Sequence, residues 1–142
     1  MVKFWIPGEF VSERKRSVRR GEFTTRIDTP DRATFKAKVA VFALKAMKGS
    51  PPLTGPLCVV MDFVRPVPPS WPKNPTKANP WPDQPWKKPD LDNLAKILSD
   101  PLSGIVYHDD AQVVRLVLEK KWGELSHVAV RVFGMGDPEG GA

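Results

Sequence analysis

The sequence predicts a single α+β domain in which a mostly antiparallel sheet is combined with two main helices. Its length of 142 residues suits one hydrophobic core but not two. Short alternating apolar runs indicate strands, and two longer stretches with apolar residues every three or four positions indicate helices. We expect residues 1–133 to form one compact domain and the glycine-rich acidic tail at 134–142 to be disordered.

Short apolar segments of strand length predict the sheet. Several of them alternate with polar residues, and glycine or proline stands at several of their ends. The last two, separated by a turn at residues 121–124, should pair as an antiparallel hairpin. The expected strands are Lys3–Ile6, Glu9–Ser12, Phe23–Ile27, Leu57–Val64, Val113–Glu119 and Val128–Val132.

The first helix is predicted from its start signals and its apolar stripe. Thr29 suits the N-cap, and Pro30 suits the first helical position. The helix should run from about Asp31 to Lys48, before a Gly-Ser-Pro-Pro sequence ends it. Its buried stripe is expected to be Phe35, Val39, Phe42 and Ala46.

A second helical pattern follows Asp90, with leucine and isoleucine recurring every three or four residues as far as Ile105. Pro101 stands inside this pattern, where proline removes a hydrogen bond and clashes with the preceding turn. We therefore expect a kink or break there, with Asp100 capping a second helical turn.

Two acidic pairs flank this second helical segment and are the candidate catalytic residues. Asp90 and Asp92 begin it, whereas Asp109 and Asp110 precede the next strand. Because the chain runs out along the helix and back, the two pairs can converge. Carboxylate oxygens from two elements suit Mg²⁺, one ion or two, and Lys96, one turn after Asp92, would support the charge of phosphoryl transfer.

Each of these residues also has a structural interpretation, which is the commoner one for a single residue. Asp90 suits an N-cap, and Asp109 and Asp110 suit a turn. Lys96 can pair with Asp92 on a solvated helix face. The combination of two acidic pairs with a lysine between them, in a basic chain, favours function.

Charge is distributed unevenly along the chain, which carries a net +6. Residues 1–48 hold 12 Lys and Arg against 5 acids, whereas residues 91–142 hold 5 against 8. A basic half attracts a polyanion, while clustered acids repel phosphate unless a metal covers them. The alternative is a generally basic soluble surface. The clustering of the acids favours nucleic acid as the partner.

Five basic residues between positions 14 and 20 form the predicted DNA-contacting loop. Arginine suits phosphate because its planar guanidinium makes bidentate contacts, although an exposed loop with no partner has the same composition. Lys87 and Lys88 are further DNA candidates because they adjoin the first acidic pair. The loop candidates are Arg14, Lys15, Arg16, Arg19 and Arg20.

Residues 66–89 hold nine prolines and three tryptophans, so we expect a long loop without helix or sheet. One interpretation is a flap in which Trp71, Trp81 or Trp86 stacks on an unpaired base. The other, which is commoner for tryptophan, is packing on the body or on a partner subunit.

No apolar run approaches the about 20 residues of a membrane span, and the first residues lack a signal-peptide pattern, so we expect a cytoplasmic protein. Cys58, the single cysteine, lies in an apolar run and is expected to be a buried small hydrophobe.

The segment around the two acidic pairs resembles the core motif of the RusA-type Holliday-junction resolvases. Outside this segment the similarity is loose, and two departures from the family pattern are Pro101 and Glu13, which stands where the family tends to have a basic residue. The residues that carry the resemblance are Asp90-Leu91-Asp92-Asn93-Leu94, Lys96, Asp100, Leu102 and Asp109-Asp110-Ala111-Gln112-Val113.

The resemblance implies a homodimeric, Mg²⁺-dependent endonuclease of DNA recombination and repair, with Mn²⁺ as a substitute metal. Such an enzyme cuts four-way DNA junctions by paired symmetric nicks. Asp90, Asp92 and Asp110 fall on the metal-binding carboxylates of the family and Lys96 on its essential lysine. Asp109 matches a commonly acidic neighbour.

Two other functions remain as alternatives. A branched or single-stranded DNA-binding protein would have the same basic surface without catalysis. A nucleotide-sugar transferase would use an Asp-x-Asp motif for its metal, but the chain is short for one and lacks a recognisable nucleotide-binding unit.

Overall fold

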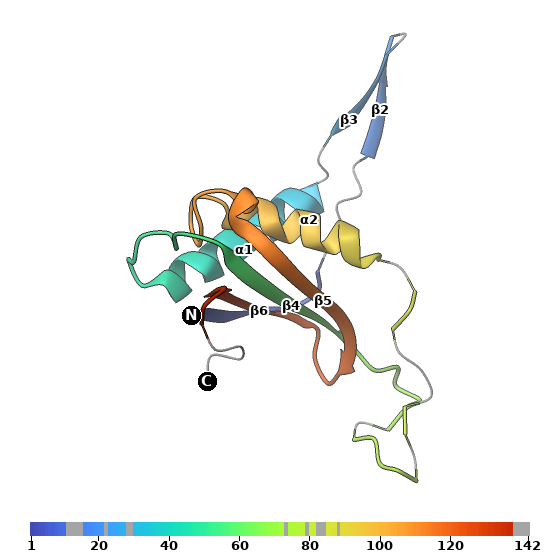
Figure 1. Cartoon of the computed structure of the whole chain (residues 1–142). Helices are drawn as coiled ribbons and strands as arrows, with labels where there is room; N and C mark the ends of the chain where they lie inside the picture. The colour runs from blue at the N-terminus through green and yellow to red at the C-terminus, as the bar shows by residue number, and fades with distance from the viewer. Residues whose placement is uncertain are drawn as a thin grey trace.

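The computed structural model describes residues 1–10, 16–21, 23–27, 30–72, 74–78, 80–81, 85–87 and 89–137, with the backbone alone at 16–20, 23–27 and 30. Its body is a four-stranded sheet with two α-helices packed on one face (Figure 1). The elements are β1 (Val2–Pro7), β2 (Arg16–Arg20), β3 (Phe23–Ile27), α1 (Pro30–Met47), β4 (Leu57–Pro66), α2 (Leu91–Leu102), the 3₁₀ segment η1 (Asp110–Gln112), β5 (Val113–Gly123) and β6 (His127–Gly134).

The strand order in the sheet is β1-β6-β4-β5. The β1–β6 and β6–β4 pairs are antiparallel and the β4–β5 pair is parallel, which confirms the predicted mostly antiparallel α+β fold. The predicted hairpin of the last two strands is wrong, because β4 lies between β5 and β6. Strand β4 is buried on both faces, as its nearly continuous apolar sequence requires, and this places it in the sheet interior.

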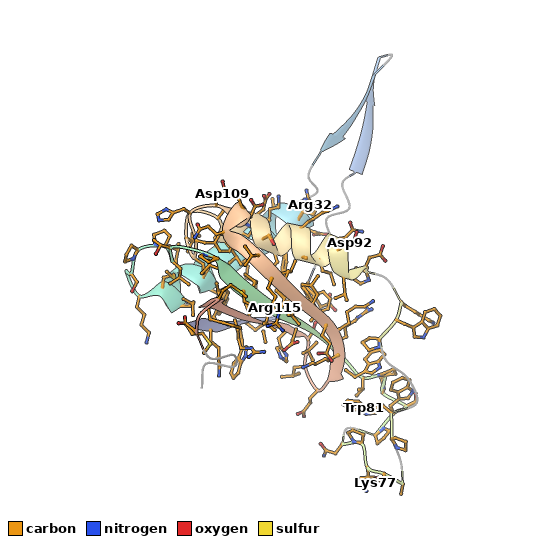
Figure 2. All side chains as sticks on the ribbon, in the orientation of Figure 1. Arg32, Lys77, Trp81, Asp92, Asp109 and Arg115 are labelled. Atoms are coloured by element: carbon orange, nitrogen blue, oxygen red, sulfur yellow. The ribbon has the colours of Figure 1, made fainter. Side chains whose placement is uncertain are left out.

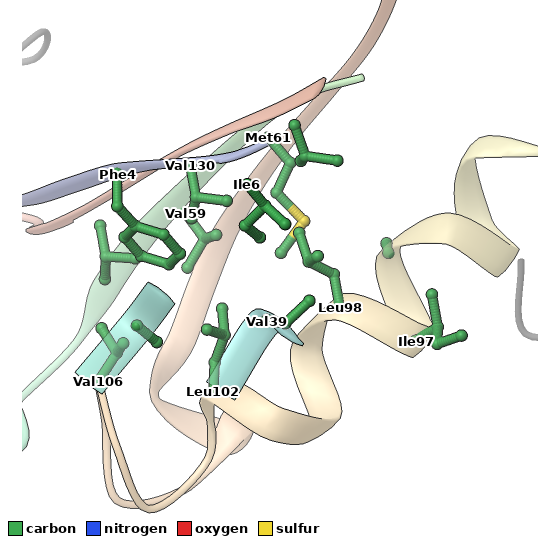
Figure 3. Close-up of a cluster of buried hydrophobic side chains, with 14 of the residues drawn as sticks. Phe4, Ile6, Val39, Val59, Met61, Ile97, Leu98, Leu102, Val106 and Val130 are labelled. Carbon is green, nitrogen blue, oxygen red and sulfur yellow. The ribbon is translucent and has the colours of Figure 1, made fainter. Parts of the chain in front are cut away.

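The core lies between the sheet and the two helices (Figure 3). Alternate residues of β4, such as Val59 and Met61, face the helices, while Cys58 and Val60 pack with Phe133 in a smaller cluster. Cys58 is fully buried and unbridged, as expected. Neither helix among the described residues is long and apolar enough to span a bilayer.

Helix α1 matches the predicted helix to within one residue at each end. Its buried face is rotated slightly from the predicted stripe: Phe35 and Val39 are buried as expected, but Ala43 and Met47 are buried in place of Phe42 and Ala46, which are only partly covered. Arg32 on the same helix is also fully buried.

Helix α2 runs through Pro101 and ends at Leu102, so the predicted second helical turn capped by Asp100 is wrong. Pro101 leaves one carbonyl of the preceding turn without its helical N–H partner, and the helix ends one residue later. Gly104, at a φ of +85°, then reverses the chain, and its N–H donates to the Tyr107 carbonyl over 2.7 Å.

Residues 16–20, predicted as part of a loop, instead form β2, which pairs with β3 in a hairpin. The chain turns at Gly21, whose φ of +61° suits glycine. In Figure 1 this hairpin stands away from the sheet and helices. The predicted extended run over Glu9–Ser12 is not a strand at its described residues, 9 and 10.

The described residues between Val67 and Pro89 contain neither helix nor strand, as predicted. In the predicted tail, Gly134 ends β6 and donates its N–H to the Asp137 carboxylate over 3.0 Å. Residues 138–142 lie outside the described residues.

Candidate active site

A shallow cavity of about 490 Å³ lies between α2 and β5 and gathers most of the predicted catalytic residues. Three carboxylates and one ammonium group line it, above two leucines of the edge strand β5. Figure 2 shows Asp92 on α2 and Asp109 near the beginning of β5. The lining residues are Asp92, Ala95, Lys96, Ser99, Asp100, Asp110, Leu116 and Leu118.

Helical periodicity explains why α2 presents a polar face here. Asp92, Lys96, Ser99 and Asp100 recur at spacings of three and four residues and therefore share one side of the helix. The residues between them, Leu94 and Leu98 among others, are fully buried against the sheet. Apolar burial thus fixes which side chains of α2 face the cavity.

Asp109 and Asp110 have different roles. Asp109 is the N-cap of η1, and its carboxylate accepts a hydrogen bond from the Ala111 N–H over 2.9 Å. Asp110 is the first residue of η1 and lines the cavity. Asp109 thus caps η1, whereas Asp110 lines the cavity together with Asp92 and Lys96.

Gln112 anchors this segment and was missed as a site-building residue. Its Oε1 accepts the N–H groups of His108 and Asp109 over 2.8 and 3.1 Å. Its Nε2 donates to the carbonyls of Leu53 and Gly55 over 3.0 and 3.1 Å. The Asp-x-x-Gln spacing of a capping box was the sequence signal for this role.

The crowding of carboxylates shifts the pKa of two of them. A hydrogen bond with Asp109 favours the protonated form of Asp110 and raises its pKa, and lost solvation and the charges of Asp109 and Asp100 add to this. The pKa of Asp109 is lowered, first by the Ala111 N–H that its carboxylate accepts. A cation in the cavity would relieve this repulsion.

Tyr107, the single tyrosine, lies beneath the acidic residues. It is buried, and its hydroxyl donates to the Ser99 carbonyl over 3.3 Å. Burial raises the pKa of Tyr107 to about 12, with the charges of Asp110 and Asp100 as further causes. The pKa of Tyr107 therefore depends first on its burial and then on the negative charge of the nearby carboxylates.

Asp100, for which the sequence predicted only a cap, is a cavity residue. Its carboxylate accepts a hydrogen bond from Lys36 Nζ over 3.0 Å, which links α2 to α1. The Asp100 side chain is still 70% exposed. The sequence signal for the cavity position of Asp100 was its spacing from Asp92, which is eight residues or about two helical turns.

Asp90 is the predicted site residue that does not line the cavity. It occupies the N-cap position of α2, but its side chain makes no capping hydrogen bond. Among the residues that the structure describes, no three His, Cys, Asp or Glu side chains are close enough to hold a metal as they stand. The acidic side chains that line the cavity nevertheless all offer carboxylate oxygens, which are the ligands that a hard cation such as Mg²⁺ prefers.

The predicted DNA-contacting residues are described only in part. Arg16, Arg19 and Arg20 lie in β2, where the backbone alone is described. Lys87 is exposed, and its carbonyl accepts a hydrogen bond from Lys120 Nζ over 2.9 Å. Arg14, Lys15 and Lys88 lie outside the described residues, as does Glu13.

Comparison with known proteins gives one family and one relative. The family model described as Endodeoxyribonuclease RusA matches residues 7–133, which include every element except most of β1 and the last residue of β6. Uncharacterized protein YqaN of Bacillus subtilis (strain 168) is 35% identical over 136 residues, covering 92% of this chain and 94% of that protein.

Proposed function

We propose, because this chain belongs to the RusA endodeoxyribonuclease family, that it resolves four-way DNA junctions by paired, symmetric, metal-dependent cuts. The observation that carries this proposal is the cavity that Asp92, Lys96 and Asp110 line together. These residues come from two elements and are all exposed to an approaching phosphate. The proposed role of the enzyme is in DNA recombination and repair.

Asp90, Asp92 and Asp110 are the proposed ligands of Mg²⁺, for which Mn²⁺ would substitute. Asp90 precedes Asp92 by two residues and would join it by a side-chain movement at the start of α2. When bound, the cation would activate water and neutralise phosphate charge. Asp92 and Asp110 support this role because both are exposed carboxylates that line the same cavity.

Lys96 is proposed to stabilise the negative charge that develops on the phosphate oxygens. Its ammonium group is exposed and lies one helical turn beyond Asp92 on the same face. An ammonium group acts on phosphate as a point charge. Asp100, held to α1 by Lys36, would keep the far end of the cavity acidic without adjoining the scissile phosphate.

The β2–β3 hairpin is the proposed DNA grip, together with Lys87 and Lys88. It carries Arg16, Arg19 and Arg20 on a ribbon that stands away from the body (Figure 1). Arg16→Ala should weaken junction binding and reduce the slope of log affinity against log salt by about one. An unchanged slope would exclude a phosphate contact by Arg16.

A homodimer is proposed because two symmetric cuts need two sites related by a two-fold axis. The outer face of α1 offers apolar surface for a second copy, since Val41 is 47% and Leu44 58% exposed. Leu44→Glu should therefore lower the mass in solution, measured by light scattering, from dimer to monomer. An unchanged mass would exclude this face as the interface.

The decisive experiment is cleavage of a labelled synthetic four-way junction with Mg²⁺ or with EDTA. The wild-type chain should make paired nicks with Mg²⁺ only. Asp92→Asn should bind the junction without cutting it, because a repulsive charge is removed while the ligand is lost. Asp31→Asn is the matched control, since Asp31 is likewise an exposed aspartate in the first turn of a helix.

A second candidate is a branched-DNA binding protein without catalysis. It is favoured by one observation: the described carboxylates do not form a three-residue metal group as they stand. Tight junction binding in EDTA, with no cutting by the wild-type chain in Mg²⁺ or Mn²⁺, would support this candidate and exclude the nuclease.

A further inference from the structure

A second cavity, of about 700 Å³, lies where the ends of β4 and β5 meet the segment between β4 and α2. Three of the five tryptophans in the sequence line it, namely Trp71, Trp86 and Trp122, together with five prolines. Its charged residues are Arg65, Lys87 and Glu9, so the lining has an excess of positive charge. The lining of the cavity is thus aromatic, rich in proline and weakly basic.

The tryptophans present two kinds of aromatic surface. Trp71 packs edge-on against Trp122, with ring centroids 5.2 Å apart and planes at 72°. Trp86 is 69% exposed, and Lys87 Nζ lies 5.8 Å from the centroid of its ring. The first two rings pack together in the lining, and the third is largely exposed, with the Lys87 ammonium group over its ring.

Hydrogen bonds hold this segment to the sheet. Lys120 Nζ on β5 donates to the carbonyls of Lys87 and Pro89, over 2.9 and 3.2 Å. The Val67 N–H donates to the Gly123 carbonyl over 3.0 Å. Proline also restricts the backbone at the five lining positions that it occupies, and such restriction lowers the entropic cost of binding a ligand.

The aromatic cavity adjoins the acidic one. Pro89 lines the first, and Asp92, three residues later, lines the second. On β5, Leu118 lines the acidic cavity and Trp122 the aromatic one. Four strand residues span about 13 Å, which equals about four phosphate steps of a stacked DNA strand. One strand can therefore reach both cavities.

We propose that the aromatic cavity binds an unpaired nucleobase of the DNA strand whose phosphodiester lies at the acidic cavity. The base stacks on Trp86, and Lys87 and Arg65 contact the flanking phosphates. This inference rests on the proposed function, because it names the part of a junction that the enzyme recognises. A proline-rich peptide fits less well, since five of the chain's own prolines already surround the indoles.

The test is Trp86→Ala, with Trp5→Ala as the matched control. Trp5 on β1 is 65% exposed, close to the exposure of Trp86, but does not line the cavity. Binding of labelled oligodeoxythymidine and of a fully paired duplex is measured by fluorescence anisotropy in EDTA. Trp86→Ala should weaken oligodeoxythymidine binding about tenfold and leave duplex binding unchanged. Trp86→Phe should retain most of the affinity, because a ring face remains.

Three outcomes would overturn the inference. The first is that Trp86→Ala binds oligodeoxythymidine as tightly as Trp5→Ala does. The second is that Trp86→Ala loses as much affinity for the duplex as for oligodeoxythymidine. The third is a changed mass in solution with unchanged oligodeoxythymidine binding, which would assign the cavity to a subunit contact. Because these measurements need no cleavage, their failure is distinguishable from a failure of the nuclease proposal, which the Mg²⁺ assay tests.

Discussion

The two acidic pairs differ in what their first members do. Asp109 uses its carboxylate to cap η1, whereas Asp90 occupies the N-cap position of α2 without making a capping hydrogen bond. The second members, Asp92 and Asp110, both line the cavity. Local hydrogen bonding therefore distinguishes the two first members: Asp109 caps its segment with its carboxylate, and Asp90 does not.

The largest expected effect separates the two residues of the second pair. Asp110→Asn should slow junction cleavage about a thousandfold or more, because a bound metal contributes several kcal/mol to transition-state stabilisation. Asp109→Asn should cut nearly as fast as wild type, since an asparagine oxygen also caps a helix. Single-turnover cleavage rates in Mg²⁺ measure both, and equal losses would contradict the division of roles.

Lys96→Gln should reduce the cleavage rate about a hundredfold, the usual effect of losing one charge-stabilising donor. Junction affinity in EDTA should not change, because the group acts on the transition state. Lys45→Gln, an exposed lysine on α1, is the control and should cut normally. A loss of affinity without a loss of rate would make Lys96 a DNA contact instead.

Ultraviolet titration of Tyr107 tests whether its hydroxyl is buried near the charge of Asp110. The single tyrosine should ionise near pH 12 in the folded chain, compared with about 10 when unfolded. Since the folded pKa is the higher one, this group's stabilising contribution is complete below the unfolded pKa and is lost as the pH rises through about 12. Asp110→Asn should lower the midpoint by removing a nearby charge, with circular dichroism checking that the chain stays folded. A midpoint near 10 in the folded chain would contradict the burial.

The smallest expected effect concerns stability. Asp109→Ala should lower the free energy of unfolding slightly, because η1 loses its N-cap hydrogen bond. Asp109→Asn should lose less stability, since an asparagine oxygen also caps a helix. Urea unfolding of the two variants measures the difference, and equal losses would mean that the capping hydrogen bond does not account for the effect.

Much of the fold could be predicted from local patterns, but the strand order could not. The bounds of α1 and the positions of β3 and β4 follow from caps and apolar runs. The last two strands looked like a hairpin because alternation shows that a segment is a strand without naming its partner. Only the tertiary position of β4, between them, decides the pairing.

The site was predictable to a similar degree. Asp92, Lys96 and Asp110 share one cavity, as their spacing suggested, because α2 and the following turn bring them together. Asp100 was assigned to a cap, since a helix break at Pro101 was expected and the helix instead continues. Arg16–Arg20 were assigned to a loop because five of the seven residues at 14–20 are basic, which leaves no apolar alternation to indicate a strand.

Gln112 ties the position of Asp110 to the connection between α1 and β4, through the carbonyls of Leu53 and Gly55. Insertions in that connection, far in sequence from Asp110, would therefore alter the affinity of the proposed metal site. Selection for the proposed metal binding would then extend to a linker that has no chemical part in the reaction.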